Sequence, residues 1–111
     1  CHVYDLANSV TVVFESEDSR VRNNIFNVGD TPENYTKKML IKEIIKVVPD
    51  LKVKYVHKGE DPRDYRVNFD KIANILDFNI SKIVPQGISE ISRLVKSGVI
   101  ADVYSKKYSN I

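Results

Sequence analysis

The chain has 111 residues, of which 42% are hydrophobic, and its 17 basic and 15 acidic residues give a formal charge of +2. This length suits one domain, and the hydrophobic content is too high for a disordered chain. The small net charge, spread along the sequence, argues against a nucleic acid or a membrane surface as partner. No apolar run approaches the roughly 20 residues that a membrane-spanning helix needs.

The single cysteine, Cys1, cannot form an internal disulfide, which favours a reducing, cytoplasmic location. Because the chain starts at cysteine and not at methionine, we expect it to be part of a longer polypeptide. A lipid-modified cysteine is the less favoured explanation, since an apolar pattern follows at once where a polar linker would be expected. Cys1, His2 and His57 lack the spacing of metal ligands.

The first predicted element is an amphipathic helix that starts at Asp5 and ends near residues 16–19. The Asp5 carboxylate can cap its start by accepting from free backbone N–H groups. Its apolar residues fall on one helical face: Leu6, Val10, Val13 and Phe14. The segment NIFNVGD then predicts a short buried strand over residues 25–28, stopped by Gly29.

The clearest helix lies in TPENYTKKMLIKEIIKVVPD. Its apolar stripe consists of Leu40, Ile41, Ile44, Ile45 and Val48. Either Thr31, followed by proline, or Thr36 can cap its start, and Pro49 ends it. The alternating segment LKVKYV, residues 51–56, predicts a half-exposed strand.

The segment KGEDPRDYRV, residues 58–67, gathers charge around one proline. Taken alone, it is best explained as a salt-bridged loop. Arginine is nevertheless the natural ligand of a pyrophosphate, because its planar guanidinium makes two parallel charge-assisted hydrogen bonds. Arg63 and Arg66 point to opposite faces of an extended segment, so only one of them can easily serve a given ligand.

Two more helices are predicted in the last third of the chain. Asn68 can cap a helix over residues 69–76. The residues that this helix buries are Ile72 and Leu76. The last helix starts near Pro85 and stops at Gly98. Its inward residues are Ile88, Ile91, Leu94 and Val95.

The predicted fold class is therefore α/β: one small, helix-rich domain over residues 1–111 with two or three short strands. So few strands rarely stand alone unless helices cover them, which indicates a neighbouring domain. The sequence has neither a P-loop nor a G-x-G-x-x-G fingerprint, so a dinucleotide has no glycine cradle in it.

Four segments, HVYDLANSV, NIFNVGD, DPRDYRVNFDKIANILDF and VPQGISEI, follow one another in a familiar order. In this order and spacing the chain resembles the C-terminal part of an extended short-chain dehydrogenase/reductase, of the NAD-dependent nucleotide-sugar epimerase/dehydratase family. In that family the third segment precedes a helix ending in L-G-F or L-G-W. Here Leu76–Phe78 reads L-D-F, so an aspartate replaces the glycine. The resemblance covers nearly the whole chain.

The resemblance implies that the chain is a substrate-binding lobe that is inactive alone. In such enzymes an N-terminal Rossmann domain, missing from this chain, binds NAD and carries the catalytic Tyr-x-x-x-Lys pair. The lobe itself binds no cofactor and closes over a nucleoside-diphosphate-sugar. This would explain why no cofactor motif is found in the sequence.

The resemblance also implies which residues meet the substrate. Arg63 is the residue that would contact the diphosphate, with Lys58 or Arg66 as alternatives. The loop over residues 30–35 would lie near the substrate and shape specificity. Its substrate-binding residues would be Asn34 and Tyr35. A second function stays open, a non-catalytic interaction or dimerisation module whose exposed apolar face seals a homo-oligomer.

Overall fold

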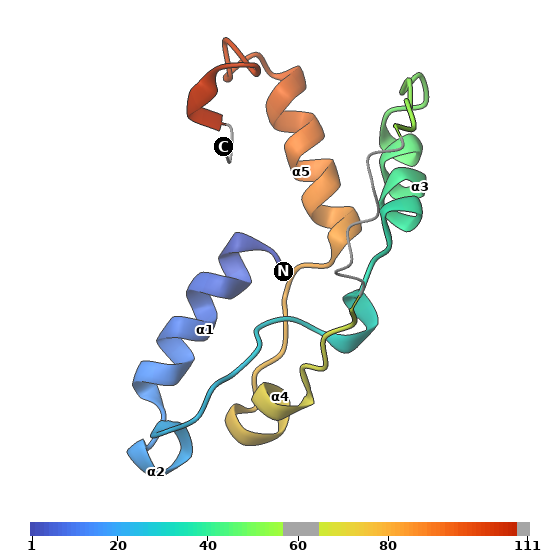
Figure 1. The fold of residues 1–111 in the computed structure, drawn as a ribbon. Coiled ribbons are helices and arrows are strands. Elements are labelled where there is room, and N and C mark those ends of the chain that lie inside the picture. The colour runs from blue at the N-terminus through green and yellow to red at the C-terminus, as the bar shows by residue number, and fades with distance from the viewer. Residues whose placement is uncertain (57–64, 109–111) are drawn as a thin grey trace.

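The computed structural model describes residues 1–56 and 65–108. The α-helices are α1 (Val3–Glu15), α2 (Asp18–Val21), α3 (Lys37–Val47), α4 (Asp70–Leu76) and α5 (Val84–Lys96). Two short 3-10 helices, η1 (Thr31–Glu33) and η2 (Lys106–Tyr108), complete the regular structure. Figure 1 shows α1, α2 and α4 in one half of the molecule, with α3 and α5 in the other.

The predicted α/β fold class is wrong, because the described part of the chain is 54% helical and contains no strand. Residues 25–28 and 51–56 are free of helix, as predicted. A strand, however, also needs a neighbour that exchanges ladder hydrogen bonds with it. No such ladder joins either segment to another described segment, so neither forms a strand.

Helix α1 is capped by His2 and not, as predicted, by Asp5. The Nδ1 atom of His2 accepts a hydrogen bond of 3.1 Å from the backbone N–H of Tyr4. The helix ends at Ser16, whose N–H donates to the Val13 carbonyl, and this end agrees with the prediction. The Asp5 carboxylate is used elsewhere in the fold, which the next subsection describes.

Both threonines considered for the start of the central helix begin a helix. Thr31 opens η1, and Thr36 caps α3 by accepting from the Met39 N–H at 3.3 Å. The predicted cap of α4, Asn68, is wrong by one residue: the cap is Phe69, and α4 begins at Asp70, one residue later than predicted. The Asn68 side chain still accepts from the Asp70 N–H at 2.8 Å.

Helix α4 ends at Asp77, which adopts the left-handed conformation with φ 53° and ψ 25°. This is the position at which the family motif has glycine, the residue that adopts such a conformation most readily. Arg20 lies across this end of the helix. Its guanidinium donates to the Ile75 carbonyl and lies 3.3 Å from the Asp77 carboxylate. Arg20 thus donates to one of the backbone carbonyl groups that a helix C-terminus leaves without a hydrogen bond.

The core lies where α1 and α4 meet the extended segment before η1 (Figure 1). Its buried hydrophobic residues are Ile72, Leu76 and Phe78, two of which were predicted to be buried. Partly buried side chains from several elements surround them: Val12, Val13, Val21, Phe26, Val28, Ile75 and Ile80. At the other end of the molecule α5 packs against α3.

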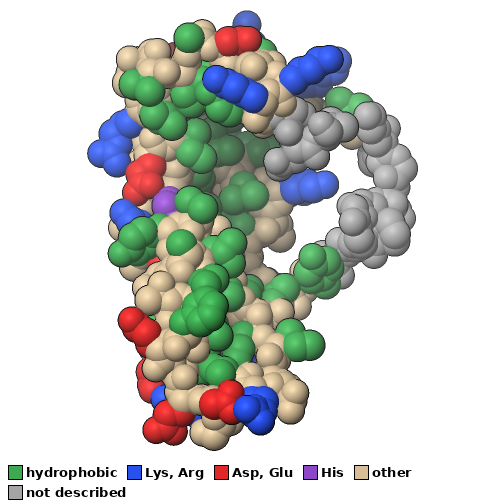
Figure 2. All heavy atoms as spheres, turned by 90° about the vertical axis from the view of Figure 1, so that its left-hand side faces the viewer, with side chains coloured by type: hydrophobic (Ala, Val, Ile, Leu, Met, Phe, Trp, Pro, Cys, Tyr) green, Lys and Arg blue, Asp and Glu red, His purple; other side chains and the backbone are tan. Residues whose placement is uncertain are grey.

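The predicted inward stripes of α1 and α5 are largely wrong. Phe14 of α1 is 84% exposed and Ile91 of α5 is 65% exposed. Of the predicted stripe on α1, Val13 does pack against the core. The inner face of α1 otherwise carries the buried polar residues Asp5 and Ser9, together with Val12. Hydrophobic side chains therefore run along the face of the molecule that Figure 2 shows.

The molecule is elongated, with a radius of gyration of 17.3 Å. A compact domain of 100 residues has a radius of gyration of about 13 Å. No helix within the two described ranges is long and apolar enough to cross a membrane.

Candidate functional site

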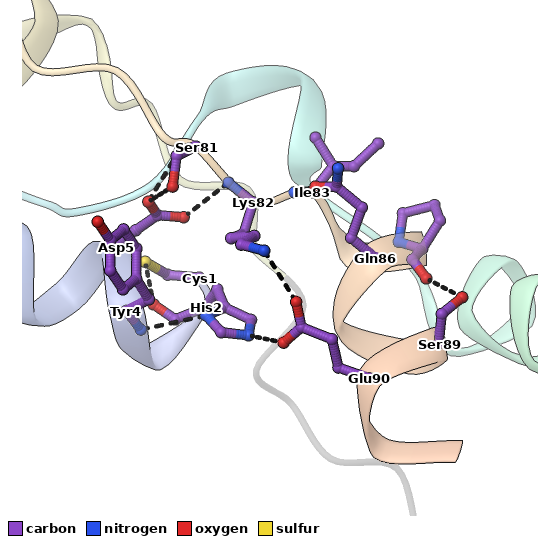
Figure 3. Close-up of polar contacts among 11 residues, drawn as sticks. Cys1, His2, Tyr4, Asp5, Ser81, Lys82, Ile83, Gln86, Ser89 and Glu90 are labelled. Atoms are coloured by element: carbon purple, nitrogen blue, oxygen red, sulfur yellow. Dashed lines mark hydrogen bonds and ion pairs between the residues drawn. The ribbon is translucent and has the colours of Figure 1, made fainter. Parts of the chain in front are cut away.

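A completely buried carboxylate, Asp5, links α1 to the loop between α4 and α5 (Figure 3). One of its oxygens accepts from the backbone N–H and the hydroxyl of Ser81, both at 2.8 Å. The other oxygen accepts from the Lys82 N–H at 3.0 Å. Burial alone would raise the pKa of Asp5, but these hydrogen bonds outweigh it and hold the pKa below its ordinary value.

Beside this loop, the carboxylate of Glu90 in α5 contacts two other side chains (Figure 3). Its Oε2 lies 3.0 Å from His2 Nε2, and its Oε1 accepts from the Lys82 ammonium at 2.9 Å. The hydrogen bonds from Lys82 and then from His2 lower the pKa of Glu90. Because His2 Nδ1 accepts from Tyr4, the ring proton lies on Nε2 and is donated to Glu90.

A pocket of about 410 Å³ lies between the N-terminus of α1, η1 and α5. Most of its wall is apolar and is formed by Val3, Phe69, Ile80, Ile83, Ile88 and Ile91. The polar residues that line it include His2, Asp30, Glu33, Lys82 and Glu90. An apolar pocket with a few convergent polar groups is the usual form of a ligand site. This pocket is therefore the candidate functional site.

All four segments that carry the family resemblance contribute to this pocket. His2 comes from the first, Gly29 from the second, Phe69 from the third and Gly87 from the fourth. The contact between the second and the third is tight, since a Cβ atom on Gly29 would lie 2.7 Å from Phe69 Cε1. Segments that are far apart in the sequence thus meet around one cavity.

The turn η1 and the adjoining Asn34 hold the chain at and just after the end of the charged segment over residues 58–67, called the charged strip below. The Asn34 amide donates to the Val67 carbonyl at 2.9 Å and accepts from the Val67 N–H at 3.1 Å. The Thr31 hydroxyl accepts from the Phe69 N–H and donates to the Asp70 carboxylate, both at 3.2 Å. These bonds fix the backbone of the chain where it enters the pocket wall.

The same turn also reaches the start of α5. The Glu33 carboxylate accepts from the Val84 N–H at 2.7 Å, which places a negative charge at the N-terminus of that helix. Such an acceptor satisfies one of the donors that a helix start leaves unpaired. η1 therefore connects the charged strip to the last helix.

The structure places three of the five predicted site residues. Asn34 is half-buried, and its amide is engaged by the backbone of Val67. Tyr35 is half-buried beside it, and burial together with nearby Glu33 and Glu43 raises its pKa.

Arg66 is exposed and lies next to the clamped residue Val67. Arg63 and Lys58 lie outside the described residues. The structure thus brings Asn34 to the C-terminal end of the charged strip, where Arg66 also lies.

The sequence did not reveal the cluster of His2, Lys82 and Glu90. Nothing in the sequence signals that residues 88 positions apart will form a hydrogen bond. His2 lies three residues before the predicted helix start at Asp5, and it caps the helix because α1 begins earlier, at Val3. No group of three or more potential metal ligands occurs in the described part of the chain.

No family model matches this sequence. No solved structure matches the chain. Its function therefore has to be inferred from its own residues.

Proposed function

We propose that the chain is the substrate-binding lobe of an NAD-dependent nucleoside-diphosphate-sugar epimerase/dehydratase. The observation that supports this proposal is the convergence of all four family-like segments on one pocket. A chance likeness of short motifs gives no reason for them to meet in space. A shared task at a substrate site gives such a reason.

Within this proposal the charged strip binds the diphosphate. Arg63 makes the main contact, with Lys58 and Arg66 as alternatives, because a guanidinium matches two phosphate oxygens at once. Asn34 positions the charged strip, because its two hydrogen bonds hold the backbone of Val67 at the end of that strip. Tyr35 lies beside it and contributes to substrate selection.

The redox chemistry belongs to a Rossmann domain that covers this lobe and binds NAD. When bound to that domain, NAD would supply reversible hydride transfer at a hydroxyl-bearing carbon of the sugar. The side chains of this lobe orient the nucleotide-sugar and exclude water. The apolar face on α1 supports the presence of such a covering domain, since monomers rarely leave a large continuous apolar patch exposed (Figure 2).

The test is titration calorimetry of nucleoside-diphosphate-sugars into the full product of the gene. Replacing Arg63 by alanine should weaken binding by about 1.5–3 kcal/mol, the scale of a hydrogen bond to a charged group. The matched control is Arg22→Ala, because Arg22 is exposed and pairs with Asp18 at 2.7 Å on the same short helix turn. Unchanged affinity in Arg63→Ala would reject the assignment of the diphosphate contact.

A second arm of the test concerns the cofactor. The 111-residue chain by itself should not bind NAD in a fluorescence titration, because the proposal places the cofactor on the covering domain. Tight binding of NAD by the chain would overturn this division of roles.

The alternative function, an interaction or dimerisation module without catalysis, also has an observation in its favour. Val3, Val10 and Phe14 are exposed on α1 at the spacing of a helix-pairing seam. In that case the chain would pair with itself, and no nucleoside-diphosphate-sugar would bind. Calorimetry therefore separates the two functions.

A further inference from the structure

His2 joins α1 to α5 through its two ring nitrogens (Figure 3). Its Nδ1 atom accepts from the Tyr4 N–H at 3.1 Å, and this bond caps α1. Its Nε2 atom lies 3.0 Å from the Glu90 carboxylate on α5. The ring also lies close to the backbone of α5, since a Cβ atom on Gly87 would meet its Cδ2 at 3.5 Å. One half-buried side chain thus holds the start of one helix and contacts a second helix.

These two hydrogen bonds require the neutral form of the ring. A ring nitrogen that accepts from a backbone N–H carries no proton, so the proton of His2 lies on Nε2 and faces Glu90. A protonated imidazole has an N–H group at both nitrogens and can accept no hydrogen bond. Protonation would therefore set the Nδ1–H of His2 against the N–H of Tyr4. The cap of α1 and the charged form of His2 exclude each other.

The charged groups around His2 act on its contact to Glu90 and not on the cap. Lys82, from the loop before α5, shares the Glu90 carboxylate with His2, and Asp5 adds a negative charge from α1 itself. Lys82 and then His2 hold the pKa of Glu90 below its ordinary value, so Glu90 stays ionised where histidines titrate. The contact between His2 and Glu90 therefore survives protonation of the ring, as an ion pair. The other acidic residues that line the same pocket are Asp30 and Glu33.

We propose that His2 is a pH-sensitive switch in the wall of the pocket. In the neutral form it caps α1 and binds Glu90, and in the charged form it keeps Glu90 and releases the cap. Because His2 and Val3 both line the pocket, the first turn of α1 and this part of the wall loosen together. Histidine side chains change charge between about pH 5 and pH 8, which sets the range of the switch. The switch adds a regulation that does not depend on which ligand the pocket takes.

The test is nuclear magnetic resonance of the full gene product with isotope-labelled histidine and tyrosine, followed from about pH 8 to about pH 5. At the alkaline end the His2 ring should show a bare Nδ1 and a protonated Nε2. As the ring gains its second proton, the Tyr4 amide proton should shift upfield with the same midpoint, because it loses its acceptor. In His2→Asn this shift should be absent, since asparagine caps a helix and does not titrate.

A second pair of variants tests the part of Glu90. Glu90→Gln keeps an acceptor but removes the charge, so the transition of His2 should move to lower pH by about half a pH unit or more. The control Glu43→Gln should leave the transition in place, because Glu43 pairs with Lys46 at 2.7 Å within α3.

Three results would overturn the switch: a Tyr4 amide proton that does not follow the titration of His2, a ring proton on Nδ1 at alkaline pH, or a transition unmoved in Glu90→Gln. None of these measurements involves a nucleoside-diphosphate-sugar. The switch and the proposed function can therefore fail separately.

Discussion

Asp5 illustrates how a single side chain can join two parts of a chain that are far apart. Its carboxylate is fully buried and accepts three hydrogen bonds from Ser81 and Lys82. In Asp5→Asn one acceptor oxygen becomes an NH2 donor that faces N–H or O–H groups. We expect the free energy of unfolding to fall by about 2–3 kcal/mol, measured by urea denaturation. The exposed Asp18→Asn should change it by no more than about 0.5 kcal/mol.

The same carboxylate should make stability depend on pH in the acid range. The pKa of Asp5 in the folded protein lies below its ordinary value of 3.8, so at acid pH the unfolded state binds more protons. The ionised Asp5 carboxylate therefore contributes its full stabilisation above its ordinary pKa. That stabilisation is lost as the pH falls through the pKa that Asp5 has in the folded protein. The difference in stability between the parent and Asp5→Asn should shrink below pH 4. A difference that stays constant would contradict a role for the ionised carboxylate.

Two glycines at the pocket should respond in opposite ways to alanine. A Cβ on Gly29 would lie 2.7 Å from the Phe69 ring, so the ring has to move. We expect Gly29→Ala to lower the free energy of unfolding by about 1–3 kcal/mol. A Cβ on Gly87 would meet His2 Cδ2 at an ordinary 3.5 Å, within a helix where alanine is favoured. Gly87→Ala should therefore raise stability by about 0.5–1 kcal/mol in the same denaturation experiment. Equal effects would contradict the packing described for Gly29.

For single residues, some structural roles could be predicted from the sequence and others could not. Thr36 caps α3 as predicted, through an N–H group three residues away, whereas Asn68 bonds the Asp70 N–H without being the cap of α4, which is Phe69. Asp5 was also expected to act locally, but its partners lie 76 and 77 residues along the chain. A local rule cannot choose between a near and a distant partner. Asn34 was predicted as a substrate residue, and the structure shows its amide bonded to backbone.

Among the elements, α4 offers the clearest test of backbone conformation. Asp77 holds a left-handed conformation that costs roughly 1–2 kcal/mol for a residue with a side chain. Its ion pair with Arg20 is exposed and contributes at most about 1 kcal/mol. We expect Asp77→Gly to raise the free energy of unfolding by about 0.5–1 kcal/mol. Arg20 keeps its hydrogen bond to the Ile75 carbonyl in this variant.

The matched variant at this position is Asp77→Val. A β-branched residue adopts the left-handed conformation with more strain than aspartate, so stability should fall by about 1–2 kcal/mol. Thermal unfolding of both variants measures the contrast. If glycine and valine were equally tolerated, the end of α4 could not have the conformation described.

The four longer helices, α1, α3, α4 and α5, were predicted to within a few residues because capping and periodicity are properties of neighbouring residues. The one-turn helix α2 was not predicted. Strands require a partner, and neither 25–28 nor 51–56 has one among the described segments. Periodicity also identifies an apolar stripe without saying what covers it. The stripe that includes Phe14 was assigned to the core and lies on the surface. The convergence of four segments on one pocket could not have been read from their spacing, because it depends on how α1, η1 and α5 pack together.

For the whole molecule, the exposed apolar face of α1 is the surface through which both proposed functions would have the chain associate. Phe14 is 84% exposed and makes no contribution to the buried core, so Phe14→Glu should leave the free energy of unfolding of the chain within about 0.5 kcal/mol of the parent. A charge at the centre of an apolar contact is costly, however, because it has to be desolvated without a partner. The variant should therefore weaken association through this face.

Sedimentation velocity distinguishes what covers the face. In the proposed function the face is covered by the cofactor-binding domain, so in the full gene product Phe14→Glu should loosen that contact and increase the sensitivity to protease. In the alternative function the chain itself dimerises, and the variant should convert the dimer to a monomer. The control Glu15→Gln changes a neighbouring exposed charge and should alter neither result. A variant that behaves like the parent in both measurements would show that α1 faces water, and would remove the support that this face gives to a covering domain.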